Sequence, residues 1–255
     1  MTAGPTRVGA RTPAAVPPEI RRQLESGELE TANFMEQIAL NVDALLRSQL
    51  PAVGEGPPLA HLPLKLRLRA VGDRLANAIP SSQIINVVSA KSDTIRAAGA
   101  MAIGTNPSVG AAERLRLLEP FADDRHFAVR EWAWIGLRDE LGESLSALVP
   151  DLTSWSHDER PTLRRFASEV TRPRGVWTRH LRTFRKEPWR ALCLLTPLAH
   201  DSNQYVQTSV GNWLNDAGRD HPKWVRAVCD SWLTHVAADK GTAWTCRHGQ
   251  RSLET

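Results

Sequence analysis

The sequence predicts an all-α fold, an α-solenoid of HEAT-like helix pairs with one concave face. Helix-forming runs with apolar residues at three- and four-residue spacing follow one another along the 255-residue chain. No stretch alternates apolar and polar residues for long enough to indicate a strand. A short sequence pattern also returns at a fixed interval, which is typical of solenoids of stacked helix pairs.

The repeated pattern is an aliphatic residue, an arginine, two further residues and a small residue. It occurs as IRAAG, VREWA and LRRFA, whose arginines Arg96, Arg130 and Arg164 are spaced by 34 residues, and a degenerate copy has Gln207 instead. Because second helices of successive units line the concave surface of such arrays, we expect these side chains to form one row. The alternative is that each arginine pairs with an aspartate of a neighbouring repeat and serves packing alone.

The N-terminal part of the chain predicts a tail followed by helices. Residues 1–17 are rich in Gly, Pro, Ala and Thr, so we expect a flexible tail, followed by a single domain over residues 18–255. The apolar spacing predicts one helix over residues 31–50 and an amphipathic helix over residues 64–79. The basic residues of the second helix are either a solvated face or a stripe that contacts phosphate groups.

Composition limits the function classes. The chain has 32 Lys and Arg against 28 Asp and Glu, a balance that permits a nucleic-acid partner without requiring one. Its three cysteines lack CxxC spacing and its eight histidines do not cluster at metal-ligand spacing, so we expect no disulfide framework and no metal. Since no apolar run reaches the length of a membrane helix, we expect a cytoplasmic protein without membrane contact.

Residues 163–216 combine charged, amide and aromatic side chains in a way that indicates a binding surface. The first part contains Arg172 and Arg174 on either side of Pro173, which restricts the backbone between two side chains that suit phosphate groups. Three of the tryptophans outside this loop are expected in the core: Trp132, Trp134 and Trp213.

Four motifs in this order carry a family resemblance: HFAVREWAWIGLR, RRFASEVTRPRGVW, YVQTSVGNWLNDAGRDHPKWV and WTCRHGQRSL. With the N-terminal stretch, they resemble the DNA alkylation repair family of HEAT-like repeat DNA glycosylases, most closely its AlkC branch, over residues 16–253. The sequence departs from the family pattern at Gln207 and Gly249. The resemblance implies a concave DNA-binding face that clamps duplex DNA, and hydrolysis of the N-glycosidic bond of cationic N-alkylated bases.

The resemblance also implies which residues act. The catalytic positions correspond to Asp216, Glu169, Trp177 and Glu131. We expect Asp216 to hold a water and to stabilise positive charge on the sugar, and Trp177 to face the cation through a cation–π contact. For Glu131, pairing with Arg130 or Arg165 is an equally open alternative.

The expected DNA contacts are Arg130, Arg164, Arg165, Arg172, Arg174, Asn212 and Asn215. The expected partner is duplex DNA containing alkylated bases, and the enzyme would be a monofunctional monomer that uses neither a cofactor nor a nucleotide. The preferred lesion stays open between 3-methyladenine, 1-methyladenine, 3-methylcytosine and 7-methylguanine. The alternative function is a non-catalytic HEAT-repeat scaffold that binds DNA or protein.

Overall fold

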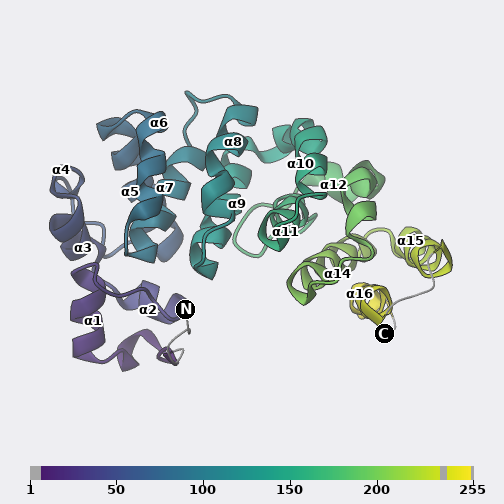
Figure 1. Cartoon of the computed structure of the whole chain (residues 1–255), viewed down its shortest axis with the longest axis horizontal. Helices are drawn as coiled ribbons and strands as arrows, with labels where there is room; N and C mark the ends of the chain where they lie inside the picture. The colour runs from purple at the N-terminus through teal and green to yellow at the C-terminus, as the bar shows by residue number, and fades with distance from the viewer. Residues whose placement is uncertain (1–6, 236–239, 254–255) are drawn as a thin grey trace. The chain divides into compact units, whose positions relative to one another are not determined.

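A computed structural model describes residues 7–235 and 240–253 of the chain. Its regular structure is helical, and these residues contain no strand, which confirms the predicted all-α class (Figure 1). The chain forms two compact units: unit 1 comprises residues 1–109 and 124–136, and unit 2 comprises residues 110–123 and 137–255. The single domain over residues 18–255 stays a prediction.

Unit 1 is organised around the contact between two of its longer helices, α5 and α7. Its helices are η1 (Pro13–Ala15), α1 (Pro18–Glu25), α2 (Phe34–Ala39), α3 (Val42–Gln49), α4 (Pro51–Gly54), α5 (Leu64–Ala78), α6 (Ser81–Ile84), η2 (Ile85–Ser89), α7 (Asp93–Gly104) and most of α9 (Phe127–Leu141). A Cβ atom at Gly72 would lie 2.8 Å from the backbone nitrogen of Ala102. Glycine therefore allows α5 and α7 to approach closely.

The helix predicted over residues 31–50 is two helices, α2 and α3. Leu40 is extended at the end of α2, and the side chain of Asn41 accepts hydrogen bonds from the backbone nitrogens of Asp43 and Ala44. Asn41 is thus an N-cap, which starts a new helix inside an apolar pattern that has the helical period throughout.

The helix predicted over residues 64–79 is confirmed as α5. One of its basic residues fits neither predicted role, because Arg67 is buried. Its guanidinium group donates to the carbonyl oxygens of Ile38 (3.1 Å), Leu40 (3.2 Å) and Leu62 (3.1 Å). Arg67 therefore satisfies backbone acceptors at the end of α2 and in the segment that leads to α5.

The described part of the N-terminal segment contacts the rest of unit 1. Arg7 forms an ion pair with Glu36, with 2.6 Å between Nη2 and Oε2, and Val16 is buried. The flexibility of residues 1–17 stays a prediction. Residues 1–6 lie outside the described residues.

Unit 2 is organised around α14, which packs against α11 and α16 (Figure 1). Its helices are α8 (Ala111–Ala122), η3 (Gly142–Leu148), α10 (Val149–Trp155), α11 (Pro161–Val170), α12 (Arg182–Lys186), η4 (Pro188–Ala191), α13 (Leu192–Leu195), η5 (Thr196–Leu198), α14 (Gln204–Gly218), α15 (Pro222–His235) and α16 (Lys240–Gln250). A Cβ at Gly211 would lie 2.7 Å from the ring of His248, and a Cβ at Gly249 would lie 2.8 Å from the Cβ of Leu214. The two glycines interlock α14 with α16.

The repeated arginines share one structural role. Each donates to carbonyl oxygens five or six residues earlier: Arg96 to Ala90 and Lys91, Arg130 to Asp124 and Arg125, Arg164 to Asp158 and Glu159, and Gln207 to Asp201. These bonds hold the turn that precedes each repeat helix. Arg96 also binds Asp124 (Nε to Oδ2, 2.7 Å), and Arg164 binds Asp201 (Nε to Oδ2, 2.5 Å). Pairing with an aspartate of the next repeat, the alternative interpretation, therefore describes Arg96 and Arg164.

Candidate active site

Two of the predicted catalytic carboxylates meet in unit 2 through one arginine. Glu169 lies in the last turn of α11, Arg172 follows that helix, and Asp216 lies near the end of α14. Arg172 donates through Nε to Oδ2 of Asp216 (3.0 Å) and through Nη1 to Oε2 of Glu169 (3.3 Å). Glu169 and Asp216 are 3% and 6% exposed. The packing of α14 on α11 thus brings together residues 47 positions apart in the sequence.

Only one oxygen of Asp216 is occupied. Both contacts from Arg172 go to Oδ2, at 3.0 Å from Nε and 2.9 Å from Nη2, and Oδ1 accepts no hydrogen bond from the described residues. Burial raises the pKa of Asp216 above its usual value, and the charge of Arg172 acts in the opposite direction. A carboxylate fixed by one oxygen can offer the other to a water molecule or to a positive charge.

Glu169 has a second, looser ion pair on its other oxygen. Arg165 approaches Oε1 with Nη2 at 3.5 Å, and its guanidinium carbon lies 4.3 Å from the centre of the Tyr205 ring. The predicted DNA contact Arg165 therefore lies beside the carboxylates, held against an aromatic face by a cation–π contact. In these positions Arg165 and Arg172 both add positive charge to the site.

A buried arginine that the sequence analysis did not select holds the loop after α11. Arg138 is 1% exposed and donates to the carbonyl oxygens of Val170 (3.1 Å), Arg172 (2.6 Å) and Arg179 (3.0 Å). Burial and the nearby charge of Arg172 lower the pKa of Arg138 to about 10. A signal was present in the sequence, because Arg138 shares a helix face with the apolar Trp134, one turn earlier.

The loop that Arg138 holds also carries the predicted aromatic residue. A Cβ at Gly175 would lie 2.0 Å from Oγ1 of Thr178 and 3.1 Å from Nη2 of Arg138, so this turn requires glycine. Trp177 is 42% exposed, in contrast to the core tryptophans. The structure therefore leaves the Trp177 ring accessible to a ligand.

Arg174 takes part in a separate cluster. Its Nη2 atom donates to both oxygens of Asp220 (2.8 and 2.9 Å), and Arg185 binds the same carboxylate through Nε (3.0 Å) and Nη2 (3.1 Å). The hydrogen bond from Arg185, followed by the charge of Arg174, lowers the pKa of Asp220. Sequence reasoning missed Asp220, which lies 46 residues from Arg174 and has no spacing relation to it.

The amides of α14 hold positions different from those predicted. Asn212 accepts hydrogen bonds at Oδ1 from Arg251 (3.0 Å) and His248 (3.1 Å), which connects α14 to α16. Asn215 is buried, and its Oδ1 atom has no hydrogen-bond partner among the described residues. The contact of Asn215 with DNA stays a prediction, and its side chain has little exposed surface in this conformation.

The tryptophans predicted for the core are buried, which confirms that interpretation. Trp132 donates through Nε1 to Oε1 of Gln37 (3.0 Å), and Trp213 donates to Oγ1 of Thr171 (3.2 Å). Each ring therefore packs in the interior with its polar atom satisfied.

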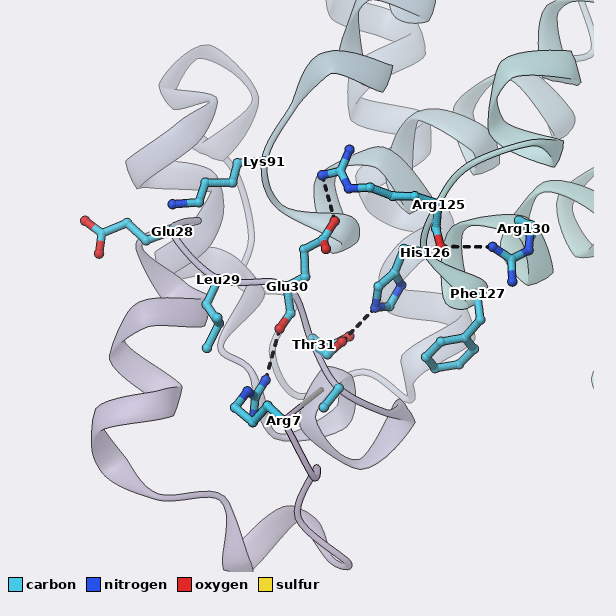
Figure 2. Close-up of a pocket in the computed structure, with 11 residues that line it drawn as sticks. Arg7, Glu28, Leu29, Glu30, Thr31, Lys91, Arg125, His126, Phe127 and Arg130 are labelled. Atoms are coloured by element: carbon cyan, nitrogen blue, oxygen red, sulfur yellow. Dashed lines mark hydrogen bonds and ion pairs between the residues drawn. The ribbon is translucent and has the colours of Figure 1, made fainter. Parts of the chain in front are cut away.

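Two predicted residues belong to unit 1. Glu131 accepts a hydrogen bond from Nε1 of Trp134 (3.1 Å). Arg130 lines a pocket of about 590 Å³, shown in Figure 2, whose basic members also include Arg7, Lys91 and Arg125. Within this pocket His126 donates from Nε2 to the carbonyl oxygen of Thr31 (2.7 Å), and Arg125 pairs with Glu30 (2.8 Å).

The ranges that the structure describes contain neither a group of metal ligands nor a membrane-spanning helix. No three or more His, Cys, Asp or Glu side chains in residues 7–235 and 240–253 are grouped so that they could hold a metal ion. None of the helices in these ranges is both long enough and apolar enough to cross a membrane.

Part of this chain is similar to known proteins. The sequence pattern of the family described as DNA alkylation repair enzyme matches residues 141–251, which include Glu169, Arg172, Trp177 and Asp216. The predicted resemblance to the DNA alkylation repair family is thereby confirmed, and the match covers both carboxylates of the candidate site.

Two individual proteins are similar to this chain. The uncharacterized protein YhaZ of Bacillus subtilis (strain 168) is 33% identical over 144 residues, which cover 55% of this chain and 37% of YhaZ. The structure of Pseudomonas fluorescens alkylpurine DNA glycosylase AlkC bound to DNA containing an abasic site analog matches with a TM-score of 0.64 and 26% identity. That match covers 76% of this chain and 54% of AlkC, so the chain spans about half or less of the length of these relatives.

Proposed function

We propose that this protein is a monofunctional DNA glycosylase that hydrolyses the N-glycosidic bond of cationic N-alkylated bases, such as 3-methyladenine, in duplex DNA. The observation that carries the proposal is the state of Asp216, which is buried, fixed through Oδ2 and open at Oδ1. It lies in the segment that matches DNA alkylation repair enzymes, and the AlkC structure with DNA supports DNA as the partner.

The chemistry of the substrate fits a site of this kind. An alkylated base that already carries a positive charge is a good leaving group, so the enzyme does not have to protonate it. What the reaction requires is negative charge near the sugar, where positive charge grows as the bond breaks, and a water molecule in position. The open Oδ1 atom of Asp216 can provide both in a region largely withdrawn from solvent.

The proposed step is a hydrolysis. The C1′–N bond breaks and its electron pair leaves with the base, which becomes neutral. The oxygen of the water bonds to C1′, and its proton passes to Oδ1 of Asp216 and then to solvent. Arg172 holds Asp216 and Glu169 in place, so no rearrangement of these side chains is needed at the moment of reaction.

The other residues of unit 2 have supporting roles in this proposal. Trp177 faces the cationic base, a contact worth about 0.5 to 2 kcal/mol according to its exposure to water. Arg165 and Arg174 contact the DNA backbone. The positive side chains that contact the two carboxylates are arginines, whose guanidinium groups do not form the Schiff base that a lyase reaction requires. This supports a monofunctional enzyme.

The proposal is tested by single-turnover release of bases from methylated duplex DNA, followed by chromatography of the released bases. Asp216→Asn is almost isosteric but removes the charge, so the rate should fall on the order of a hundredfold or more. Glu169→Gln is measured beside it, and Asp151→Asn, an exposed aspartate of α10, is the matched control. Duplexes that carry each of the four candidate lesions establish the preference.

Two outcomes would change the proposal. Retention by Asp216→Asn of more than roughly a third of the wild-type rate, against the hundredfold loss expected, would transfer the catalytic role to Glu169. If Glu169→Gln were equally active, or if the wild type released no base, the non-catalytic HEAT-repeat scaffold would replace the glycosylase.

A further inference from the structure

A second group of basic side chains in unit 2 forms a pocket outside the candidate active site. The pocket has a volume of about 350 Å³ and is lined by Arg182, Arg185, Lys186, Asp220 and His221. We propose that this pocket binds a phosphate group of the DNA backbone. The inference rests on the proposed function in one respect, since that function makes DNA the ligand.

Two cations of the pocket form no salt bridge with an acidic side chain in the described part of the chain. Arg182 and Lys186 are four residues apart on α12, so they project from the same face of the helix, and both are exposed. Among the described residues, neither side chain forms a hydrogen bond or an ion pair within 4 Å. Long cationic side chains that converge on one pocket without a partner repel each other, and an anion between them removes that repulsion.

Glu143 and Glu187, which line a neighbouring pocket together with Arg182 and Lys186, have other hydrogen-bond or ion-pair partners. Glu143 accepts hydrogen bonds from the backbone nitrogens of Arg182 (2.7 Å) and Thr183 (2.9 Å) at the start of α12, although the charge of Arg182 still contributes to lowering its pKa. Glu187 forms an ion pair with Arg190. Neither carboxylate therefore bridges Arg182 and Lys186.

The third cation of the pocket is fixed in orientation. Arg185 uses Nε and Nη2 for Asp220, and its Nη1 atom has no partner in the described part of the chain. His221 donates from Nε2 to the carbonyl oxygen of Arg185 (2.9 Å), which also holds the backbone at this point. Because two arginines lower the pKa of Asp220, this carboxylate stays ionised and the arrangement persists at neutral pH.

The composition of the pocket selects a phosphate group over other ligands. Guanidinium and ammonium groups bind phosphate oxygens through charge-assisted hydrogen bonds, and the lining contains no aliphatic or aromatic hydrocarbon side chain that would hold a base. The three cations of the pocket lie on α12, which is the segment within the longest interval between repeats. Function in solenoids often resides in such insertions, and a phosphodiester next to the damaged nucleotide is the group that this segment would meet.

The test measures binding to an undamaged duplex by fluorescence anisotropy between about 50 and 200 mM salt, the range over which phosphate contacts are resolved. The double variant Arg182→Gln, Lys186→Gln should bind roughly tenfold more weakly and lower the salt slope by about 1 to 2, as expected for one or two lost phosphate contacts. The matched control is Arg116→Gln with Arg190→Gln, which removes the same charge from two exposed arginines of unit 2, each paired with a glutamate three residues earlier. The control should change affinity less than about threefold and keep the slope.

The outcomes separate this inference from the proposed function. A wild type that binds duplex DNA but releases no base would refute the glycosylase and leave the pocket intact. A double variant that binds like the control, with circular dichroism melting showing that both are folded, would refute the pocket whatever the base-release result. A further arm compares thermal stability in inorganic phosphate and in chloride at equal ionic strength. If only free phosphate distinguished the double variant from wild type, the ligand would be free phosphate and the DNA contact would be wrong.

Discussion

Two buried aspartates near the two ends of α14 differ in how many of their oxygens are used. Asp201, before the helix, is 8% exposed, and Asp216, near its end, is 6% exposed. Both oxygens of Asp201 bind Arg164, at 2.5 Å from Nε and 3.0 Å from Nη2, and one also accepts from the backbone nitrogen of Asn203 (2.9 Å). Asp216 has donors on Oδ2 alone.

In the proposed function, this difference separates a carboxylate used for packing from one used in the reaction. Burial imposes a cost of desolvation on both, and packing is best served when each carboxylate oxygen has a donor. Asp201 meets that condition and Asp216 does not. An open oxygen on a buried carboxylate therefore indicates a role beyond stability.

The largest expected effect is that substitution of Asp201 lowers stability and substitution of Asp216 lowers the rate of base release. Asp201→Asn should lower the free energy of unfolding by about 3 kcal/mol, because breaking a buried ion pair leaves Arg164 without its counter-charge. Its rate of base release per folded molecule should stay near wild type. Asp216→Asn should show the reverse, since Arg172 keeps Glu169 as a partner.

Urea unfolding and single-turnover assays on the same two variants check this prediction. Equal destabilisation by both substitutions would contradict the prediction, because the open oxygen of Asp216 would then not distinguish its role from that of Asp201.

A smaller effect is expected for one of two exposed tryptophans. Trp177 and Trp189 are 42% and 49% exposed, but only Trp177 lies on the loop held by Arg138. Trp177→Ala should slow release of cationic bases by about two- to thirtyfold, the rate equivalent of a cation–π contact of 0.5 to 2 kcal/mol. Trp189→Ala is the control. A normal single-turnover rate for Trp177→Ala would show that the ring serves packing or binding instead.

The smallest expected effect is a shift of the pH profile. Burial raises the pKa of Asp216, so its reactive ionised form is lost, as pH falls, at a higher pH than for an ordinary aspartate. Arg172 opposes this rise, and Arg172→Ala should move the fall in rate to still higher pH. Single-turnover rates between about pH 4 and pH 8 measure the shift, with Arg190→Ala as control. A profile that is unchanged in Arg172→Ala would mean that Asp216 does not limit the rate.

The sequence predicted helices well where one apolar period controls a segment, as in α5. It failed at Asn41, because a cap inside a continuous apolar pattern does not change the period. Nor did it show that residues 7–17 make specific contacts, such as the ion pair of Arg7 with Glu36. Such contacts depend on the fold and not on local composition.

The candidate site was predictable in its members but not in their bonds. Family motifs selected Glu169 and Asp216, while Arg172 was predicted to contact phosphate. Whether its guanidinium group turns to a phosphate or to a carboxylate depends on a partner 44 residues away, a distance that spacing cannot show. Arg138 was not predicted because a buried arginine interrupts the apolar pattern of a helix in the same way as an exposed one.

The interlocked glycines of α14 and α16 have a consequence for motion. With Gly211 against His248 and Gly249 against Leu214, the two helices cannot slide or rotate past each other without steric overlap. This contact restricts the backbone that carries Asp216. If the protein acts as proposed, the position of the carboxylate is set when the chain folds and not when a substrate binds.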